Sequence, residues 1–375
     1  MISNAEMDRR WTAVREMMAD ETLDWIIATT GHPFGYYRWL TDRVGLGGPL
    51  AAIGLRGDVI LASHGDAVHH RPHDSYGVRH VASCSQLNTL VNTHAPLLVT
   101  EMRAGGSVRR IGLAGTGFLS VATRDVLVTA FPDAELVDVT DQMARLKAIK
   151  SDEEMQYIRN AARMHDEAVE LARRTIRPGI SGRDVIEEVR SFFTRQGSPV
   201  QSLMAGSAPR TEICRYSGPA ERIIQPGDLF SMLIECATES GYYSECMPTF
   251  ALDEVPAHLQ KAFDDAVECQ QMLVDSVRVG MLPAELLAKN DAFMAEHSYP
   301  GEHRLLGHSQ GLDLVERPAF SPLGETLAIE HGMVLSIHPT VHTQNAWGLP
   351  NNLSFHFTRN GIERLSKTPQ EVFVV

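Results

Sequence analysis

Two glutamates in the C-terminal part of the chain have the type and the spacing to carry chemistry. Glu235 and Glu245 flank a segment that reverses near Ser240-Gly241, so antiparallel strands there would place the two carboxylates opposite each other. Directly opposed like charges destabilise a strand pair, by about 0.2–1 kcal/mol when exposed and by more when buried. Such a pair calls for a cation, a shared proton or a basic substrate. The alternative is that one of the two side chains points to solvent.

Two histidines could complete the site. His308 lies between Gly307 and Gly311, and glycines permit close backbone approach and unusual φ/ψ, which predicts a tight turn. His338 ends an apolar run before Pro339, and side chains at strand ends commonly form sites. Two carboxylates and two imidazoles suit a single divalent zinc, iron or manganese ion, and suit magnesium poorly. The same groups suffice for metal-free acid–base catalysis, so the spacing leaves both possibilities open.

Further polar residues extend the predicted site. Arg210, Arg215 and Tyr216 lie on a loop before the first hairpin, where substrate contacts are common. Arg317 could bind a carboxylate, although a surface arginine is the alternative. Asn352 lies where the second hairpin returns, and we expect its amide to face the same cleft.

Cysteine usage argues against thiol chemistry. Cys236 and Cys246 directly follow the two glutamates, so on a strand they face the opposite side and are expected to pack. The five cysteines are odd in number and show no CxxC spacing, which is typical of a reduced, cytoplasmic protein. No signal peptide and no apolar stretch long enough to span a membrane is visible. The formal charge of −13 argues against nucleic acid or an anionic membrane as a partner.

The elements that must position these residues include a repeat. The segments around Arg177 and Arg278 are 101 residues apart, and each is preceded by a long amphipathic helix and followed by a second helix and a hairpin. Two copies are too few for a solenoid. They predict one domain of two similar halves with a cleft at their junction.

The N-terminal part has a different pattern. Residues 5–20 show helical spacing, and the apolar runs that follow alternate with helix-like stretches at 86–92 and 117–130. This alternation predicts an α/β domain, with strands at 23–28, 50–55, 59–63, 78–81, 110–113 and 134–139. The histidines between these strands match no ligand spacing, which favours an exposed loop containing His64, His69, His70 and His73.

A joint between domains is expected near residues 141–151. Ser151 and Glu154 form a capping box that begins a helix running to about Arg174. His165 lies on the apolar stripe of this helix and is interpreted as a core histidine. At 375 residues, two domains are expected, 1–145 and 151–375.

The chain resembles the creatinase/aminopeptidase P/prolidase family, peptidase M24, whose fold is called pita-bread. The resemblance covers essentially the whole chain. It implies an N-terminal α/β domain, an α+β C-terminal domain with pseudo-two-fold symmetry, and a homodimer. The segments that carry it are 145–154, 227–228 with 241–244, 307–313 and 332–339.

The resemblance also identifies departures from the family's metal ligands. Metallopeptidase members hold two metal ions with Asp, Asp, His, Glu and Glu. Only the histidine is kept here, so the resemblance implies that a standard dinuclear centre is absent. The matching positions are Glu235, Glu245, His308, His338 and Asn352.

Other positions depart from both branches of the family. The substrate-side histidine of the family matches Tyr216, and a second histidine matches Val315. Creatinase is a metal-free member, and residues 307–309 and 241–243 are particularly similar to it. Its catalytic glutamates, however, match Met247 and the Asn351-Asn352 pair. The chain therefore matches neither a standard peptidase nor a standard creatinase.

We expect an enzyme that hydrolyses a C–N bond in a small polar metabolite. Glu245 or His308 would act as general base, and His338 and Tyr216 would donate to the leaving group or the developing oxyanion. One alternative is a metalloenzyme that holds a single ion through Glu235, Glu245, His308 and His338 and cleaves Xaa-Pro-like peptides or performs a lyase reaction. The other alternative is a non-catalytic binding protein for small molecules.

Overall fold

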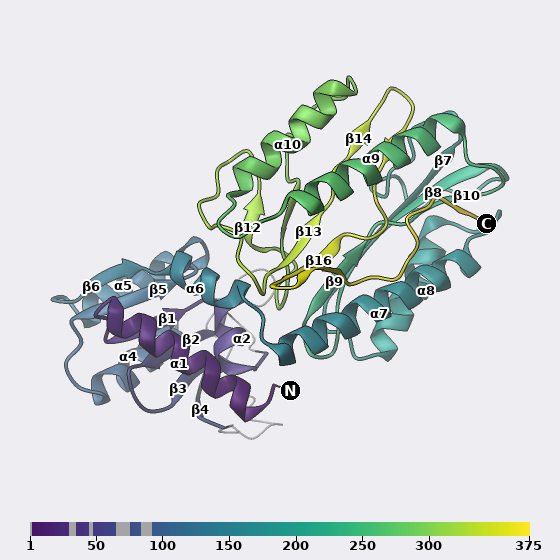
Figure 1. Ribbon diagram of the computed structural model, residues 1–375. Helices are drawn as coiled ribbons and strands as arrows, with labels where there is room; N and C mark the ends of the chain where they lie inside the picture. The colour runs from purple at the N-terminus through teal and green to yellow at the C-terminus, as the bar shows by residue number, and fades with distance from the viewer. Residues whose placement is uncertain (1, 30–34, 45–47, 65–75, 84–91) are drawn as a thin grey trace. The chain divides into compact units, whose positions relative to one another are not determined.

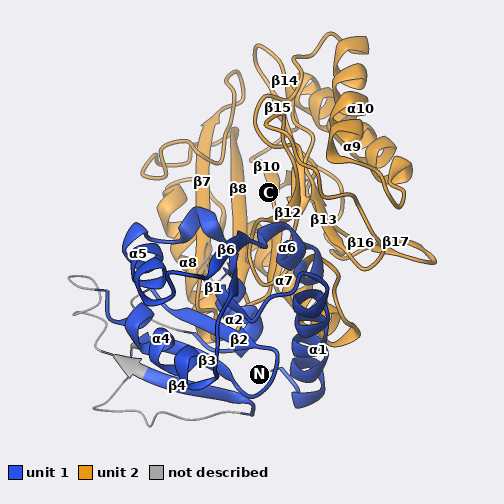
Figure 2. Cartoon of the chain, turned by 90° about the vertical axis from the view of Figure 1, so that its left-hand side faces the viewer, with its two compact units in different colours: residues 1–147 blue, residues 148–375 orange. Residues whose placement is uncertain are grey.

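The computed structural model describes residues 2–29, 35–44, 48–64, 76–83 and 92–375 (Figure 1). The chain divides into two compact units, residues 1–147 and 148–375 (Figure 2). Among the described residues, no helix has both the length and the apolar character needed to cross a lipid bilayer. Several sequence-based predictions lie outside the described residues, namely those for His69, His70 and His73 and for most of the stretch 86–92.

The first unit is built on one six-stranded sheet with the strand order β4-β3-β2-β1-β5-β6. The central strand β1 pairs in parallel with β5 and antiparallel with β2. Each strand coincides with a predicted apolar run to within a few residues, which confirms the α/β class. The strands are β1 (Trp25–Ala28), β2 (Leu50–Gly54), β3 (Val59–His64), β4 (Val78–Ser83), β5 (Arg110–Ala114) and β6 (Glu135–Asp138).

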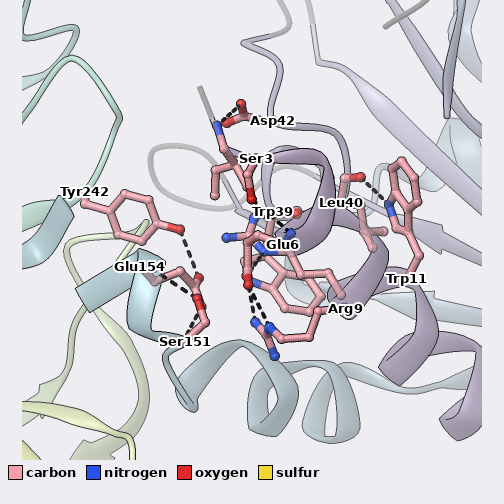
Figure 3. A network of polar contacts seen from close by, with 12 residues as sticks. Ser3, Glu6, Arg9, Trp11, Trp39, Leu40, Asp42, Ser151, Glu154 and Tyr242 are labelled. Atoms are coloured by element: carbon pink, nitrogen blue, oxygen red, sulfur yellow. Dashed lines mark hydrogen bonds and ion pairs between the residues drawn. The ribbon is translucent and has the colours of Figure 1, made fainter. Parts of the chain in front are cut away.

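Helices of the first unit pack on this sheet, and two of them, α1 (Asn4–Asp20) and α5 (Val121–Ala130), begin at serine caps. Ser3 accepts a hydrogen bond from the Glu6 amide at the start of α1, and the Trp11 indole donates to the Leu40 carbonyl (Figure 3). The helix predicted over 117–130 starts later, because the Ser120 hydroxyl caps the Thr123 amide. The helices are α1 (Asn4–Asp20), α2 (Gly35–Thr41), α4 (His94–Ala104), α5 (Val121–Ala130) and α6 (Thr140–Ala148).

The second unit contains the predicted repeat. A long helix, a turn with a positive-φ glycine (Gly179 or Gly280) and a 14-residue helix occur twice. In both copies the amide of that glycine donates to a distant carbonyl, that of Ile224 in the first copy and that of Ile329 in the second. The four helices are α7 (Asp152–Thr175), α8 (Gly182–Arg195), α9 (Ala257–Ser276) and α10 (Pro283–Glu296).

Each helix pair covers its own five-stranded sheet and has its own apolar core (Figure 1). A short hairpin, β14 (Val341–His342) with β15 (Trp347–Gly348), lies between strands of the second sheet in sequence. The first sheet consists of β7 (Gln201–Pro209), β8 (Asp228–Ala237), β9 (Tyr243–Cys246), β10 (Thr249–Ala251) and β18 (Phe373–Val374). The second consists of β11 (Gly307–Ser309), β12 (Glu316–Phe320), β13 (Val334–Ile337), β16 (Ser354–Thr358) and β17 (Gly361–Arg364).

Strand β9 connects the two halves of the second unit. The Tyr243 amide donates to the Gly311 carbonyl at 2.8 Å, and Cys246 forms an isolated bridge with Asn352. The β9 strand therefore borders the second half along its length, and its side chains can meet those of β11 and β13.

The start of α7 fixes the turn that leads into β9. Ser151 and Glu154 form the predicted capping box, and the Tyr242 hydroxyl donates to the buried Glu154 carboxylate at 2.9 Å (Figure 3). Further along α7, His165 is fully buried with both ring nitrogens in hydrogen bonds, as predicted for a core histidine.

Candidate functional site

The β8–β9 hairpin places the two glutamates directly opposite each other. Glu235 pairs with Glu245 in the antiparallel register, as the reversal near Ser240 predicts. Cys236 and Cys246 face the other side and are buried in the core beneath α7 and α8. Burial raises the pKa of both thiols, which agrees with a packing role.

The two histidines come from neighbouring strands of the second sheet. His308 pairs with Ser336 in the antiparallel β11–β13 ladder, and His338 directly follows β13. The two imidazole centroids are 5.6 Å apart. His308 therefore lies within a strand, and the prediction of a tight turn was wrong. Gly307 instead allows β11 to lie close to β13, because a Cβ at this position would lie 2.2 Å from the Ser336 carbonyl oxygen.

Glu245, His308 and His338 form one buried cluster at the junction of the two halves. Their carboxylate oxygen and imidazole nitrogens lie within 4.8 Å of one another. The Glu245 Oε1 atom is 3.6 Å from His308 Nε2, and it accepts a hydrogen bond from the Ser336 hydroxyl. Glu235 lies across the hairpin from this cluster, on a half-buried position of β8.

Burial sets the protonation of the cluster. Removal from water raises the pKa of both carboxyls, and for Glu235 the charge of Glu245 raises it further. Burial lowers the pKa of His308 and, together with the neighbouring His308, lowers that of His338 to about 3. Both imidazoles are therefore neutral at pH 7, and the carboxyl pair favours retention of a proton.

The tautomer of His308 leaves a lone pair facing Glu245. His308 Nδ1 lies 3.0 Å from the Ser309 carbonyl oxygen, which can only accept, so Nδ1 carries the proton. Nε2 is then an acceptor directed at Glu245 Oε1, which is a second acceptor when ionised. A proton on the carboxyl or a cation between the two groups resolves this opposition.

Two further predicted residues lie on a separate pocket, Arg215 as a predicted substrate contact and Tyr216 as a predicted proton donor. Arg215 and Tyr216 line a cavity of about 330 Å³ together with Trp347. The Tyr216 and Trp347 rings are 5.0 Å apart. Thr340 also lines this pocket, and its hydroxyl donates to the His338 backbone carbonyl at 3.3 Å.

The other predicted arginines are engaged in ion pairs. Arg210 contacts Asp253 at 3.2 Å and Glu254 at 2.7 Å. Arg317 binds the Glu325 carboxylate through two nitrogens, of which Nε lies at 2.9 Å. The structure does not bring these two arginines together with the cluster.

Asn352 is fully buried next to β9 but directs its amide nitrogen away from the cluster. Its Nδ2 group donates to the Thr368 carbonyl, and within the described parts of the chain its Oδ1 atom has no hydrogen-bond partner. The Gln270 side-chain amide donates a hydrogen bond to the backbone carbonyl of Asn352 at 2.7 Å. These hydrogen bonds fix the position of Asn352 and leave its buried Oδ1 atom available as an acceptor.

Ser336 is a functional neighbour that sequence reasoning missed. It lies two residues before His338, and side chains two residues apart on a strand share a face. The alternation of side-chain direction along β13 could therefore have indicated that Ser336 faces the same side as His338. Arg304, His342 and Trp347 line a separate pocket, and no comparable signal marks them, because Arg304 lies in an irregular segment and the strands of the other two are only two residues long.

Comparison with known proteins identifies the family. The sequence model described as metallopeptidase family M24 matches residues 156–362, more than half of the chain. The chain belongs to metallopeptidase family M24. This result confirms the resemblance inferred from the sequence, and M24 proteins are hydrolases. An Xaa-Pro dipeptidase of Lactobacillus delbrueckii subsp. lactis is 25% identical over 263 residues, covering 68% of this chain and 70% of that protein. An Xaa-Pro dipeptidase of Pyrococcus horikoshii is 28% identical over 244 residues, covering 64% and 68%.

Solved structures show the same fold as this M24 chain. An Xaa-Pro dipeptidase from Bacillus anthracis superimposes with a TM-score of 0.78 at 21% identity, covering 98% of this chain and all of that one. An X-Pro aminopeptidase from Thermotoga maritima superimposes with a TM-score of 0.79 at 16% identity, covering 97% and 99%. The predicted α/β unit followed by a pita-bread unit with internal pseudo-two-fold symmetry is thereby confirmed.

Proposed function

We propose that this M24 chain hydrolyses a C–N bond in a small polar substrate at the cluster of Glu245, His308 and His338. The observation that carries the proposal is the convergence of one carboxylate oxygen and two imidazole nitrogens within 4.8 Å in a buried site. These groups come from β9, β11 and the end of β13, so the fold holds them from both halves of the unit.

Each residue has a role that follows from its surroundings. Glu245 or His308 takes a proton from water, and the resulting hydroxide attacks the carbon of the C–N bond. Burial raises the pKa of Glu245 towards the range in which a carboxylate is an effective base. His338 and Tyr216 donate hydrogen bonds to the developing oxyanion or to the departing nitrogen. The proton that Glu245 or His308 took from water passes to that nitrogen as the C–N bond breaks.

A second candidate function is single-metal hydrolysis, which the donor set itself favours. One carboxylate and two neutral imidazoles are ligands that zinc, iron and manganese accept, and both imidazoles are neutral here. An ion held by Glu245, His308 and His338 would act as a Lewis acid on the substrate. A dinuclear pair does not fit, because the neutral Asn352 donates its amide to Thr368 and supplies no bridging carboxylate.

The deciding experiment combines metal analysis with kinetics. Purified protein is analysed for bound metal before and after chelation, and then assayed on Xaa-Pro dipeptides, N-acyl amino acids, guanidino compounds and cyclic amidines. We expect Glu245→Gln and His308→Ala to lower kcat by about 10²–10⁴-fold on any substrate found. The exposed Glu239→Gln is the matched control. Ligands that bind without any turnover would contradict the hydrolase proposal and favour a binding protein.

The metal question has a readout that is independent of activity. At a metal concentration of about 100 Kd, binding to the folded state adds about 2.7 kcal/mol of stability. We expect His338→Ala to abolish that increment if the ion is held by the cluster. A stoichiometric, chelator-resistant ion in the purified protein would exclude metal-free catalysis.

We further propose a homodimer, as the family resemblance implies, and a cytoplasmic location. Light scattering coupled to size-exclusion chromatography tests the first, and fractionation of the source cells tests the second. A monomer over the micromolar concentration range would contradict the dimer.

A further inference from the structure

A cavity of about 540 Å³ lies in the first unit, at the C-terminal end of α4. The start of β1, the β2–β3 hairpin and the last turn of α4 form its sides. All of its lining residues lie within residues 1–147, so the cavity is complete in the first unit and shares no residue with the Glu245 cluster. Its volume is typical of pockets that bind small molecules.

The floor of the cavity is apolar. Trp25 and the buried Ile60 form it, and the partly buried Trp25 indole packs at the edge of the core of this unit. The indole lies against two glycines, because a Cβ would lie 3.2 Å from the ring at Gly54 and 3.1 Å from it at Gly105. These two positions therefore leave the space that the aromatic ring occupies beside the cavity.

The walls of the cavity are charged, and two of the charges neutralise each other in an ion pair with a distance of 2.5 Å, that of Arg79 with Glu101. A third charge is partly compensated, because Asp58 lies close enough to Arg15 to oppose the effect of burial, which lowers the pKa of that guanidinium. One carboxylate and one guanidinium then remain for a ligand, those of Asp24 and Arg56.

The Asp24 carboxylate is held in place next to the indole. Its Oδ2 atom accepts from the Arg109 amide at 2.6 Å and from the Arg110 amide at 2.9 Å. The C-terminal end of α4 adds partial negative charge to the same cavity. An aromatic ring beside a fixed carboxylate favours a cation at Trp25.

The Arg56 guanidinium lies on the hairpin at a set distance from this cation position. Trp25 pairs with Gly54 in the β1–β2 register, and Arg56 follows two residues later, which is about 7 Å along an extended chain. The Arg15 guanidinium fixes the hairpin by donating to the carbonyls of Gly54 and Gly57 at 3.1 and 2.5 Å. Within the described parts of the chain, no carboxylate lies within ion-pair distance of Arg56.

We infer that this cavity binds a small zwitterion, with its cation against Trp25 and Asp24 and its carboxylate at Arg56. The cation is an alkylated ammonium, because such a group is weakly hydrated and gains from an aromatic and apolar floor. The guanidinium suits the other end of the ligand, since it binds carboxylates in a planar, bidentate geometry. The site is separate from the proposed hydrolysis and does not depend on it.

The test uses three probes that remove one charge at a time. N,N,N-trimethylglycine carries both charges. Its carbon isostere 3,3-dimethylbutanoate keeps the shape and the carboxylate but lacks the cation, and choline keeps the cation but lacks the carboxylate. Binding of each probe to the full chain is measured by calorimetry. We expect trimethylglycine to bind with a Kd of about 1 mM or lower, and each of the other two to bind at least about threefold more weakly.

Variants of the cavity locate the binding. Trp25→Leu should raise the Kd of trimethylglycine by about three- to thirtyfold, because the cation–π contact is lost. Asp24→Asn keeps an acceptor oxygen for the two backbone amides and removes only the charge, and Arg56→Gln changes an exposed side chain, so both should fold. Each should raise the Kd by about threefold or more. Circular dichroism checks the fold of all variants.

Controls come from the same unit and from the other one. Asp125→Asn and Arg124→Gln change exposed residues of α5 outside the cavity and should leave the Kd unchanged. His308→Ala should also bind trimethylglycine as the wild type does, whatever becomes of hydrolysis, because the cavity and the cluster lie in different units.

The outcomes decide the inference independently of the hydrolase proposal. No binding of trimethylglycine, or equal binding of its carbon isostere, would overturn the cation site, and equal binding of choline would overturn the role of Arg56. Binding that Asp24→Asn and Arg56→Gln leave unchanged, or that His308→Ala abolishes, would place the ligand elsewhere and overturn the inference. Loss of affinity in the cavity variants alone would support it.

Discussion

Ser336 donates a hydrogen bond to Glu245 across 91 positions of the chain. The bond joins β13 of the second half to β9 of the first, and its acceptor is the same oxygen that lies 3.6 Å from His308. The proposed catalytic carboxylate is therefore oriented by the opposite half of the duplicated unit.

Ser336→Ala tests this orientation. We expect the free energy of unfolding to fall by about 1–3 kcal/mol, because a buried carboxyl oxygen loses its donor. We also expect kcat to fall, since Glu245 is less restrained. Ser191→Ala on α8 is the control, because Ser191 accepts a surface hydrogen bond from Arg195. A Ser336→Ala protein as stable as the wild type would show that the hydroxyl does not restrain the carboxylate.

Gly307→Ala probes the close approach of β11 to β13. The added Cβ would lie 2.2 Å from the Ser336 carbonyl oxygen, so the strands must separate. We expect destabilisation of about 3 kcal/mol or more by urea unfolding, because the contact is with backbone that cannot rotate away. Gly117→Ala is the control, since a Cβ added there would meet no atom of the described residues within 4 Å. Equal stability of the two variants would contradict the strand register.

His165 makes stability depend on pH. Its Nε2 accepts from the Cys236 amide at 3.2 Å, and burial lowers its pKa from 6.5 to about 4. The unfolded state therefore binds the proton more tightly. The contribution is full above pH 6.5 and is lost as pH falls towards 4, by about 3 kcal/mol in total.

His165→Gln removes this dependence because glutamine does not titrate in the same range. Urea unfolding at pH 4.5, 5.5 and 7 should show a shallower loss of stability in the variant than in the wild type. The exposed His303→Gln should retain the wild-type slope. Identical slopes in all three proteins would assign the acid sensitivity to other groups.

Lys150 and Glu316 form a buried ion pair near the loop that follows His308. Their side chains are 1% and 4% exposed, Nζ lies 2.5 Å from Oε2, and Glu316 also accepts from the Asp313 amide. Lys150→Met should destabilise the protein by about 3–5 kcal/mol, because it removes the counter-ion of a buried carboxylate. Adding Glu316→Gln should recover part of the loss.

The surface pair of Arg163 and Glu167 provides the comparison for this ion pair. Both side chains are about half exposed, so Arg163→Met should cost less than about 1 kcal/mol. Calorimetric unfolding of the wild type, the two single variants and the double variant measures the difference. If Lys150→Met costs no more than Arg163→Met, the buried pair does not hold the loop.

The sequence predicted those parts of the site that depend on local pattern. A single reversal near Ser240 fixes the register of Glu235 and Glu245, so their opposition could be read from spacing. The duplicated helix pairs were visible because each copy repeats its glycine turn. His308 was predicted in a turn because glycines commonly mark turns. Gly307 instead allows close approach of β13, where it pairs with Ile337, 30 residues later.

The pocket could not be predicted for a related reason. Arg215 and Arg304 lie in irregular segments and Trp347 lies in a strand of only two residues, so no periodicity marks them and only tertiary packing brings them together. The ion pairs of Arg210 and Arg317 were hidden in the same way, since Glu254 and Glu325 lie in irregular stretches. When the partner of an arginine lies far away in the sequence, the sequence alone cannot show whether that arginine contacts a ligand or forms a surface ion pair.

The two halves of the second unit contribute different chemical groups to the cluster. Its first copy contributes carboxylates, from the β8–β9 hairpin, and its second contributes imidazoles, from β11 and the end of β13. The two halves therefore supply different groups, and the cluster needs both of them. Neither copy expressed alone would carry a complete set of reactive groups, whereas the two separately expressed fragments should regain one only by reassociating.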